Sequence, residues 1–285
     1  MKTKWCTEVS AVLCASVLLV LSGCAAKQAA TRAGPQAATA TSARVMAEPA
    51  DARAILMRMA RFLSQAPRFS VNVLSGYDAV QASGQKIEFG EVRKVTVSRP
   101  NRLRIEVEQS NGNKHLALFD GRDITVSSMP QNVYAQISRP GDIDGAIRYF
   151  INDLNMRLPL AVLLVSRLPD ELGRRVQSLD YVERTTILGT PSHHLAGRTE
   201  TVDFQVWVAE GDQPLPQRVV LTYKDAEGQP QFRALFSDWN LSPTVTDSMF
   251  AFTPLEEAKK IAFLPQLRQV AIQNPKATGQ TGGQK

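Results

Sequence analysis

The hydrophobic pattern of the chain changes its period near residue 67. Apolar side chains from Ile55 to Ala66 recur at helical spacing, with arginines largely outside the stripe, which is typical of an amphipathic helix. Pro67 ends this pattern, because proline lacks the amide hydrogen that a continuing helix needs. From Phe69 onward apolar and polar residues alternate, which indicates strands with one buried face.

The alternation predicts two blocks of short strands. The first block comprises 69–80, 86–98, 102–109, 114–119, 123–128 and 133–137, and the second comprises 176–188, 192–197, 202–209, 218–223 and 231–239. Asn111-Gly112 and Asp120-Gly121 separate neighbouring strands, and both dipeptides favour the positive φ of tight hairpins. Consecutive hairpins make an antiparallel meander.

Helical segments interrupt and follow the strands. Asp142 can cap a helix, and Pro159 and Pro169 can each open another short one. The segment Thr253-Pro254-Leu255-Glu256 has the form of a capping box and predicts a short terminal helix.

These elements predict an α+β protein, mainly antiparallel β. A twisted sheet of about eleven strands rarely stays flat, so we expect it to curl into a half-barrel. The apolar helices would cover its concave face, with 51–66 and 142–165 as a displaceable lid. The interior can then serve as a packed core, as a lipid cavity, or as both.

The first residues of the chain have the pattern of a secretion signal. Basic residues precede a mostly apolar run at 9–21 that is too short to span a bilayer stably. The tetrad Leu21-Ser22-Gly23-Cys24 resembles a bacterial lipobox, whose cysteine receives a diacylglycerol. We predict a signal peptide at 1–23 and lipidation of Cys24. A plain export signal cut elsewhere, or an uncleaved anchor, is the alternative.

Removal of that signal would change the cysteine inventory. Cys6 and Cys14 would leave and Cys24 would carry lipid, which excludes a thiol nucleophile and an internal disulfide. Two or three acyl chains anchor a protein stably, since each buried methylene contributes about 0.8 kcal/mol. Ala25 replaces the aspartate that retains many Gram-negative lipoproteins at the inner membrane. This resemblance points to the outer membrane, with the protein facing the periplasm.

The segments on either side of the expected domain contain few large apolar side chains. Residues 24–47 are rich in Ala, Thr, Gln and Ser and predict a flexible tether behind the lipid. Residues 267–285 predict a disordered tail. The half-barrel domain is therefore expected at 48–266.

Composition and motifs give no indication of a catalytic, metal or cofactor site. The 285-residue chain is 44% hydrophobic and 21% charged, as in a globular protein. His193 and His194 are adjacent on a strand and point to opposite faces, and no hydrolase elbow, P-loop or dinucleotide fingerprint is found. We predict no catalytic residue, no metal and no cofactor.

The formal net charge of +6 does not indicate a nucleic-acid partner, because none is available in the periplasm. Arg99, Arg102 and Arg104 are candidates for contact with lipid phosphates or with an acidic partner. The alternative is a solvated strand face.

Several segments resemble a family of predicted periplasmic proteins of unknown function. They are Arg99-Pro100-Asn101-Arg102-Leu103-Arg104-Ile105-Glu106, Phe119-Asp120-Gly121, Asn132-Val133-Tyr134-Ala135, Leu158-Pro159-Leu160-Ala161, residues 207–216 and Ser237-Asp238-Trp239-Asn240. The family lies near the LolA, LolB and LppX lipoprotein-carrier superfamily, whose half-barrels are lidded by helices and hold acyl chains. The resemblance therefore implies the same fold and a hydrophobic ligand.

The sequence as a whole predicts an outer-membrane-anchored lipoprotein, not an enzyme, whose half-barrel receives the acyl chains of a lipid or lipoprotein. The residues expected to line its cavity are Leu103, Ile105, Val107, Leu116, Leu118, Phe204, Val206, Val219 and Leu221 on the strands, with Phe150, Leu154, Leu160 and Leu163 on the lid. His115, opposite Leu116 and Leu118, is expected to face solvent. The alternative is a protein-interaction module of the envelope, comparable to sigma-factor regulators that sense stress, with an unknown partner.

Overall fold

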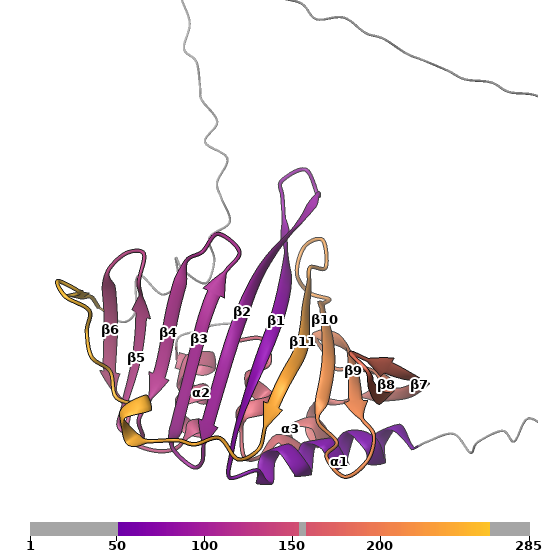
Figure 1. Ribbon diagram of the computed structural model, residues 1–285. Helices are drawn as coiled ribbons and strands as arrows, with labels where there is room; N and C mark the ends of the chain where they lie inside the picture. Colours follow the sequence, from indigo (N-terminus) through magenta and orange to yellow (C-terminus); the bar gives the residue numbers. More distant parts are fainter. Residues whose placement is uncertain (1–50, 154–157, 263–285) are drawn as a thin grey trace, which may run out of the picture. The chain divides into compact units, whose positions relative to one another are not determined.

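One twelve-stranded sheet organises the chain in this computed structural model, which describes residues 51–153 and 158–262 (Figure 1). The strand order is β12-β6-β5-β4-β3-β2-β1-β11-β10-β9-β8-β7. Every pairing is antiparallel except that of β12 with β6. The two blocks of strands therefore join in the middle of the sheet, where β1 pairs with β11.

The observed strands reproduce both predicted blocks. The first contains β1 (Arg68–Val80), β2 (Lys86–Ser98), β3 (Arg102–Gln109), β4 (Lys114–Phe119), β5 (Asp123–Ser128) and β6 (Val133–Ser138). The second contains β7 (Ser178–Ile187), β8 (Thr190–Arg198), β9 (Val202–Ala209), β10 (Pro216–Tyr223) and β11 (Gln231–Asn240), and β12 (Lys259–Lys260) follows. The hairpin glycines Gly112 and Gly121 have φ of 83° and 89°, a conformation that glycine adopts without strain.

The helices lie on one side of the sheet, except for a short 3-10 turn near the C-terminus that lies beside the opposite face (Figure 1). They are α1 (Ala52–Gln65), α2 (Ile143–Arg148), the π-helical turn η1 (Tyr149–Asp153), the 3-10 turn η2 (Ala161–Leu164), α3 (Leu168–Arg175) and a second 3-10 turn, η3 (Asp247–Met249). Asp51 caps α1 by accepting the Ala54 amide at 3.0 Å, and Asp142 caps α2 through the Gly145 amide at 2.7 Å. The apolar stripe of α1 is buried and contacts β7, β8 and β9.

The register assigns every strand residue to one of two faces. Val71 pairs with Val95, Val95 with Ile105, Ile105 with Ala117, and Ala117 with Val126. This row faces the helices and is part of the core or borders it. We call this the concave face and the other the convex face of a sheet that curves without closing. The predicted fold class, a half-barrel with helices over its concave face, is confirmed.

The C-terminal segment corrects one expectation, because residues 253–256 form no helix. The chain instead runs beside the convex face, where Arg104 Nη1 donates to the Met249 carbonyl at 3.0 Å. It then lies along β6, with the Lys259 amide donating to the Asn132 carbonyl at 3.0 Å. The open edge of β6 supplies backbone partners, and these outweigh the local capping pattern.

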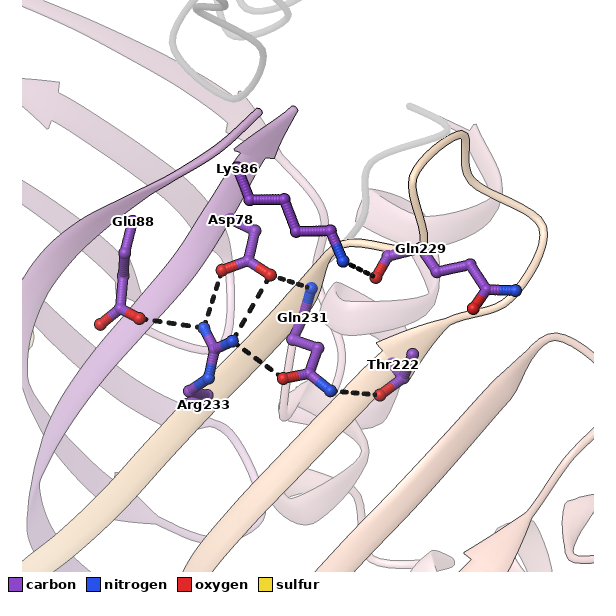
Figure 2. A network of polar contacts seen from close by, with 7 residues as sticks. All are labelled: Asp78, Lys86, Glu88, Thr222, Gln229, Gln231 and Arg233. Carbon is purple, nitrogen blue, oxygen red and sulfur yellow. Dashed lines mark hydrogen bonds and ion pairs between the residues drawn. The ribbon is translucent and has the colours of Figure 1, made fainter. Parts of the chain in front are cut away.

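A polar network joins the two strand blocks on the convex face (Figure 2). Arg233 Nη1 of β11 donates to Asp78 Oδ1 at 2.8 Å and to Glu88 Oε2 at 3.0 Å. Asp78 also accepts the Gln231 amide at 2.9 Å. Burial acts to raise the pKa of Asp78, but hydrogen bonds from Arg233 and Gln231 outweigh it and hold the pKa below its usual value. A Cβ on Gly76 would lie 2.5 Å from Glu88 Oε1, so this glycine leaves room for the network.

This network predicts a pH-dependent contribution to stability. We expect Asp78→Asn to lower the free energy of unfolding at neutral pH by about 2 kcal/mol. Because the folded pKa of Asp78 lies below the unfolded value of about 4, its stabilisation is complete above that value and is lost as the pH falls through the folded pKa. Urea unfolding should therefore show a smaller difference between variant and wild type at about pH 3. Glu88→Gln, at the exposed partner of Arg233, is the control and should change stability by less than about 1 kcal/mol. A difference for Asp78→Asn that is the same at both pH values would contradict the prediction.

Candidate functional site

A cavity of about 480 Å³ lies between the concave face and the helical segments. Its lining comes from β1 to β5 and β11, from α1 and α2, and from residues 158–164. Pockets that hold small ligands measure roughly 300–1,000 Å³ and are mostly apolar. The cavity therefore has the size of a ligand site.

Two rows of apolar side chains form most of the wall. The register places Phe69, Leu103, Phe119 and Ile124 in the first row, and Val71, Val95, Ile105, Ala117 and Val126 in the second. Phe150, Leu160 and Leu163 close the cavity from the helical side. A surface of this kind favours methylene groups over water.

The lining turns polar in the next rows along the strands. Arg93 pairs with Val107, and Val107 with His115, while Glu91 pairs with Gln109 one row further. Glu91 is 9% exposed and forms an ion pair with Arg93 on the same strand. We call Tyr77, Glu91, Arg93, Gln109 and His115 the polar end of the cavity.

The net charge of the polar end is balanced. Burial lowers the pKa of His115, although Glu91 acts against it, so the imidazole is neutral at neutral pH. Burial raises the pKa of the Tyr77 hydroxyl, and Glu91 adds to this effect. The charged groups among these five residues are therefore Arg93 and Glu91, which compensate each other.

The predicted lining residues divide into three groups. Leu103, Ile105 and Val107 line the cavity together with Phe150, Leu160 and Leu163. Phe204, Val206, Val219 and Leu221 face the same side of the sheet but belong to or pack on the core, in the half of the sheet where α1 contacts β8 and β9. Leu154 lies outside the described residues, as do Cys24 and the segments 1–23, 24–47 and 267–285.

Leu116 and Leu118 lie differently from the expectation. Both border the cavity, but they pair with Glu106 and Arg104 and so share the convex face with these charged residues. Ala117 and His115 of the same strand line the cavity from the concave face. His115 is half-buried there and does not face solvent freely. Alternation gives two sets of residues per strand, and only the pairing with β3 decides which set faces inward.

Sequence reasoning missed the polar end altogether. The sequence signal for it lies in β2, where the inward positions run from Val97 and Val95 to Arg93 and Glu91.

The three arginines predicted as candidates for anion binding also have other roles. Arg102 lies 4.0 Å from the exposed Asp247, and Arg104 pairs with Glu106 at 2.9 Å.

The third of these arginines, Arg99, joins two helical elements. Its Nε donates to the Ala66 carbonyl at the end of α1 at 3.2 Å, and its Nη1 donates to the Leu164 carbonyl at the end of η2 at 2.7 Å. Burial lowers the pKa of Arg99 and Asp144 opposes the change, but an arginine stays protonated at neutral pH. A single guanidinium therefore connects the end of α1 to the end of η2, a turn that helps to close the cavity.

Comparison with known proteins places the chain in a described group. The model of the family "Predicted periplasmic protein (DUF2092)" matches residues 52–264. No curated protein matches the chain.

Solved structures with a similar fold have low sequence identity. Lipoprotein LppX from Mycobacterium tuberculosis is 15% identical, with a TM-score of 0.43 over 68% of this chain and 97% of LppX. LprF from Mycobacterium bovis is 14% identical, with a TM-score of 0.44 over 70% and 98%. The MucA/MucB complex of Pseudomonas aeruginosa gives 18% identity and a TM-score of 0.40 over 72% of this chain and 62% of the matched chain. The chain thus spans less than two thirds of that protein's length.

Two further features concern only the part of the chain that the structure describes. None of its helices is both long and apolar enough to cross a membrane. Within the same residues, no three His, Cys, Asp or Glu side chains are grouped so that they could hold a metal ion.

The contacts of Arg99 predict that its loss loosens the cover of the cavity. We expect Arg99→Met to lower the free energy of unfolding by about 3 kcal/mol, because two carbonyl groups lose a charged donor. Amide hydrogen exchange should speed up at 161–164 before it does so in β1 to β5. Arg102→Met is the matched control, since Arg102 lies beside an exposed carboxylate. Unchanged exchange at 161–164 in Arg99→Met would rule out this role.

Proposed function

We propose that this chain, which belongs to the family of predicted periplasmic proteins (DUF2092), is a binding protein. Its half-barrel would take up an acyl chain of a lipid or lipoprotein. The observation that supports this most directly is the cavity of about 480 Å³ with two apolar rows on its sheet side. Each methylene moved from water into such a wall contributes about 0.8 kcal/mol. An acyl chain can therefore bind there through its length alone.

The route into the cavity leads past the helical segment. Phe150, Leu160 and Leu163 line the cavity from this side, and ligand methylenes would take over their contacts when the segment moves away. Arg99 is the main polar tie between this segment and α1. Opening therefore requires few hydrogen bonds to break, while the sheet stays intact.

We also propose that the protein is anchored at the outer membrane and faces the periplasm. The lipobox-like tetrad that ends at Cys24 and the residue Ala25 support this proposal. A lipid on Cys24 would keep the cavity close to a membrane, where acyl chains are available.

Filling the cavity tests ligand binding. Binding is measured by the displacement of a neutral fluorescent probe, N-phenylnaphthylamine, by a lysophospholipid. We expect Ala117→Trp to lower the affinity for the lysophospholipid at least tenfold, because the indole would occupy the second apolar row. Val92→Trp, at an exposed position of the convex face that does not line the cavity, should bind as the wild type does. Thermal melting establishes that both variants are folded. Unchanged binding by a folded Ala117→Trp variant would contradict the proposal. If the protein is instead a protein-interaction module, capture of a defined envelope partner would persist in this variant.

The anchor is tested by replacing its cysteine. We expect Cys24→Ser of the full chain to move from the membrane fraction to the soluble periplasmic fraction and to lack the mass of a diacylglycerol. Cys14→Ser, within the predicted signal, is the matched control and should remain membrane-bound with its lipid. Retention of Cys24→Ser in the membrane fraction would refute lipidation at this residue.

A further inference from the structure

The polar end of the cavity needs an explanation beyond the binding of an acyl chain. On three adjacent strands the concave face changes from apolar to polar within one or two rows. The changes are Val95 to Arg93 on β2, Val107 to Gln109 on β3, and Ala117 to His115 on β4. Ser128, which pairs with His115 from β5, has a buried hydroxyl without a hydrogen-bond partner. The cavity is therefore amphipathic along its length.

The ion pair at this end leaves some hydrogen-bonding groups of its two side chains without a partner in the described part of the chain. Arg93 donates from both Nε and Nη2 to the same oxygen of Glu91, Oε1. Glu91 Oε2 and Arg93 Nη1 accordingly have no hydrogen bond within the described residues. The guanidinium also lies 5.6 Å from the centre of the Phe232 ring, which holds it in place by a cation–π contact. One acceptor and one donor of opposite charge thus lie side by side in the cavity.

We propose that this pair binds the headgroup of a zwitterionic phospholipid, with the phosphate at Arg93 and the ammonium at Glu91. The inference rests on the proposed function, because the acyl chain of the same molecule occupies the apolar rows. A zwitterion gives each buried charge an opposite partner and leaves the cavity neutral. An anionic headgroup would bring a second negative charge next to Glu91, and like charges repel strongly in a poorly solvated site.

The groups around the pair preserve this balance. His115 and Tyr77 are uncharged at neutral pH, as shown above, and both can hydrogen-bond to phosphate or glycerol oxygens. Asp78 of β1 also borders the cavity, but its carboxylate is already bonded to Arg233 of β11. Headgroup selection is therefore assigned to Arg93 and Glu91.

The test compares two lysophospholipids with the same acyl chain, one with a phosphoethanolamine and one with a phosphoglycerol headgroup. Each competes with N-phenylnaphthylamine for the full mature chain. We expect the phosphoethanolamine lipid to bind about tenfold more tightly, which corresponds to about 1.4 kcal/mol. Glu91→Gln should reduce this preference to near onefold while binding of the neutral probe remains.

The chain offers a matched control for this variant. Glu106 also pairs with an arginine two residues away on its strand, Arg104, but on the convex face. Glu106→Gln should therefore keep the headgroup preference. The double variant Glu91→Gln with Arg93→Gln removes both charges without leaving one unpaired, and it too should bind both lipids equally.

The outcomes separate this inference from the proposed function. Equal binding of the two lipids by the unmodified chain would overturn the headgroup site alone, as would a preference that survives in both variants. Failure of the unmodified chain to bind the probe and either lipid would overturn the proposed function, and the headgroup site with it.

Discussion

The antiparallel register of β1 to β5 is the constraint on which the cavity depends. Side chains alternate between the two faces of a strand, so a shift of one residue would exchange the whole inward set for the outward set. In the observed register, Val95, Ile105 and Ala117 meet in one row, and the next row begins with Arg93. The same pairing therefore makes the apolar wall and places the polar end beside it. No separate loop or insertion is needed to build the site.

The helices divide the concave face into two parts with different properties. α1 contacts the half of the sheet around β8 and β9, where Val206 and Val219 are buried in the core. Residues 143–153 and 158–164 cover the half around β3 and β4, where the cavity remains. The packed core and the cavity are thus separated along one sheet. Arg99 bonds to the ends of both covering elements, so the packed half supports the cover of the open half.

Alternation and capping patterns were sufficient to predict the strand order along the chain, the helical insertion and the half-barrel. They were insufficient wherever a strand carries apolar residues on both faces. In β4, Leu116 and Leu118 are more hydrophobic than His115 and Ala117, yet the pairing with β3 turns the latter inward. The segment 253–256 follows the pattern of a helix start but lies near the edge of β6, whose backbone groups bind the chain that follows. In both cases partners distant in sequence decide the outcome, and local pattern cannot report them.

Two ion pairs of the same form lie on opposite faces of the sheet and differ in the exposure of their glutamates. Arg104 and Glu106 meet on the convex face, and Glu91 and Arg93 meet inside the cavity, in each case two residues apart on one strand. The convex pair is accessible to water and contributes little to stability. In the concave pair the Glu91 side chain is 9% exposed, against 44% for Glu106, and an ion pair with a buried partner is often no more stabilising than apolar side chains of similar volume. Apolar residues at both positions would extend the existing wall, so we attribute the two charges to the proposed headgroup site and not to a need of the fold.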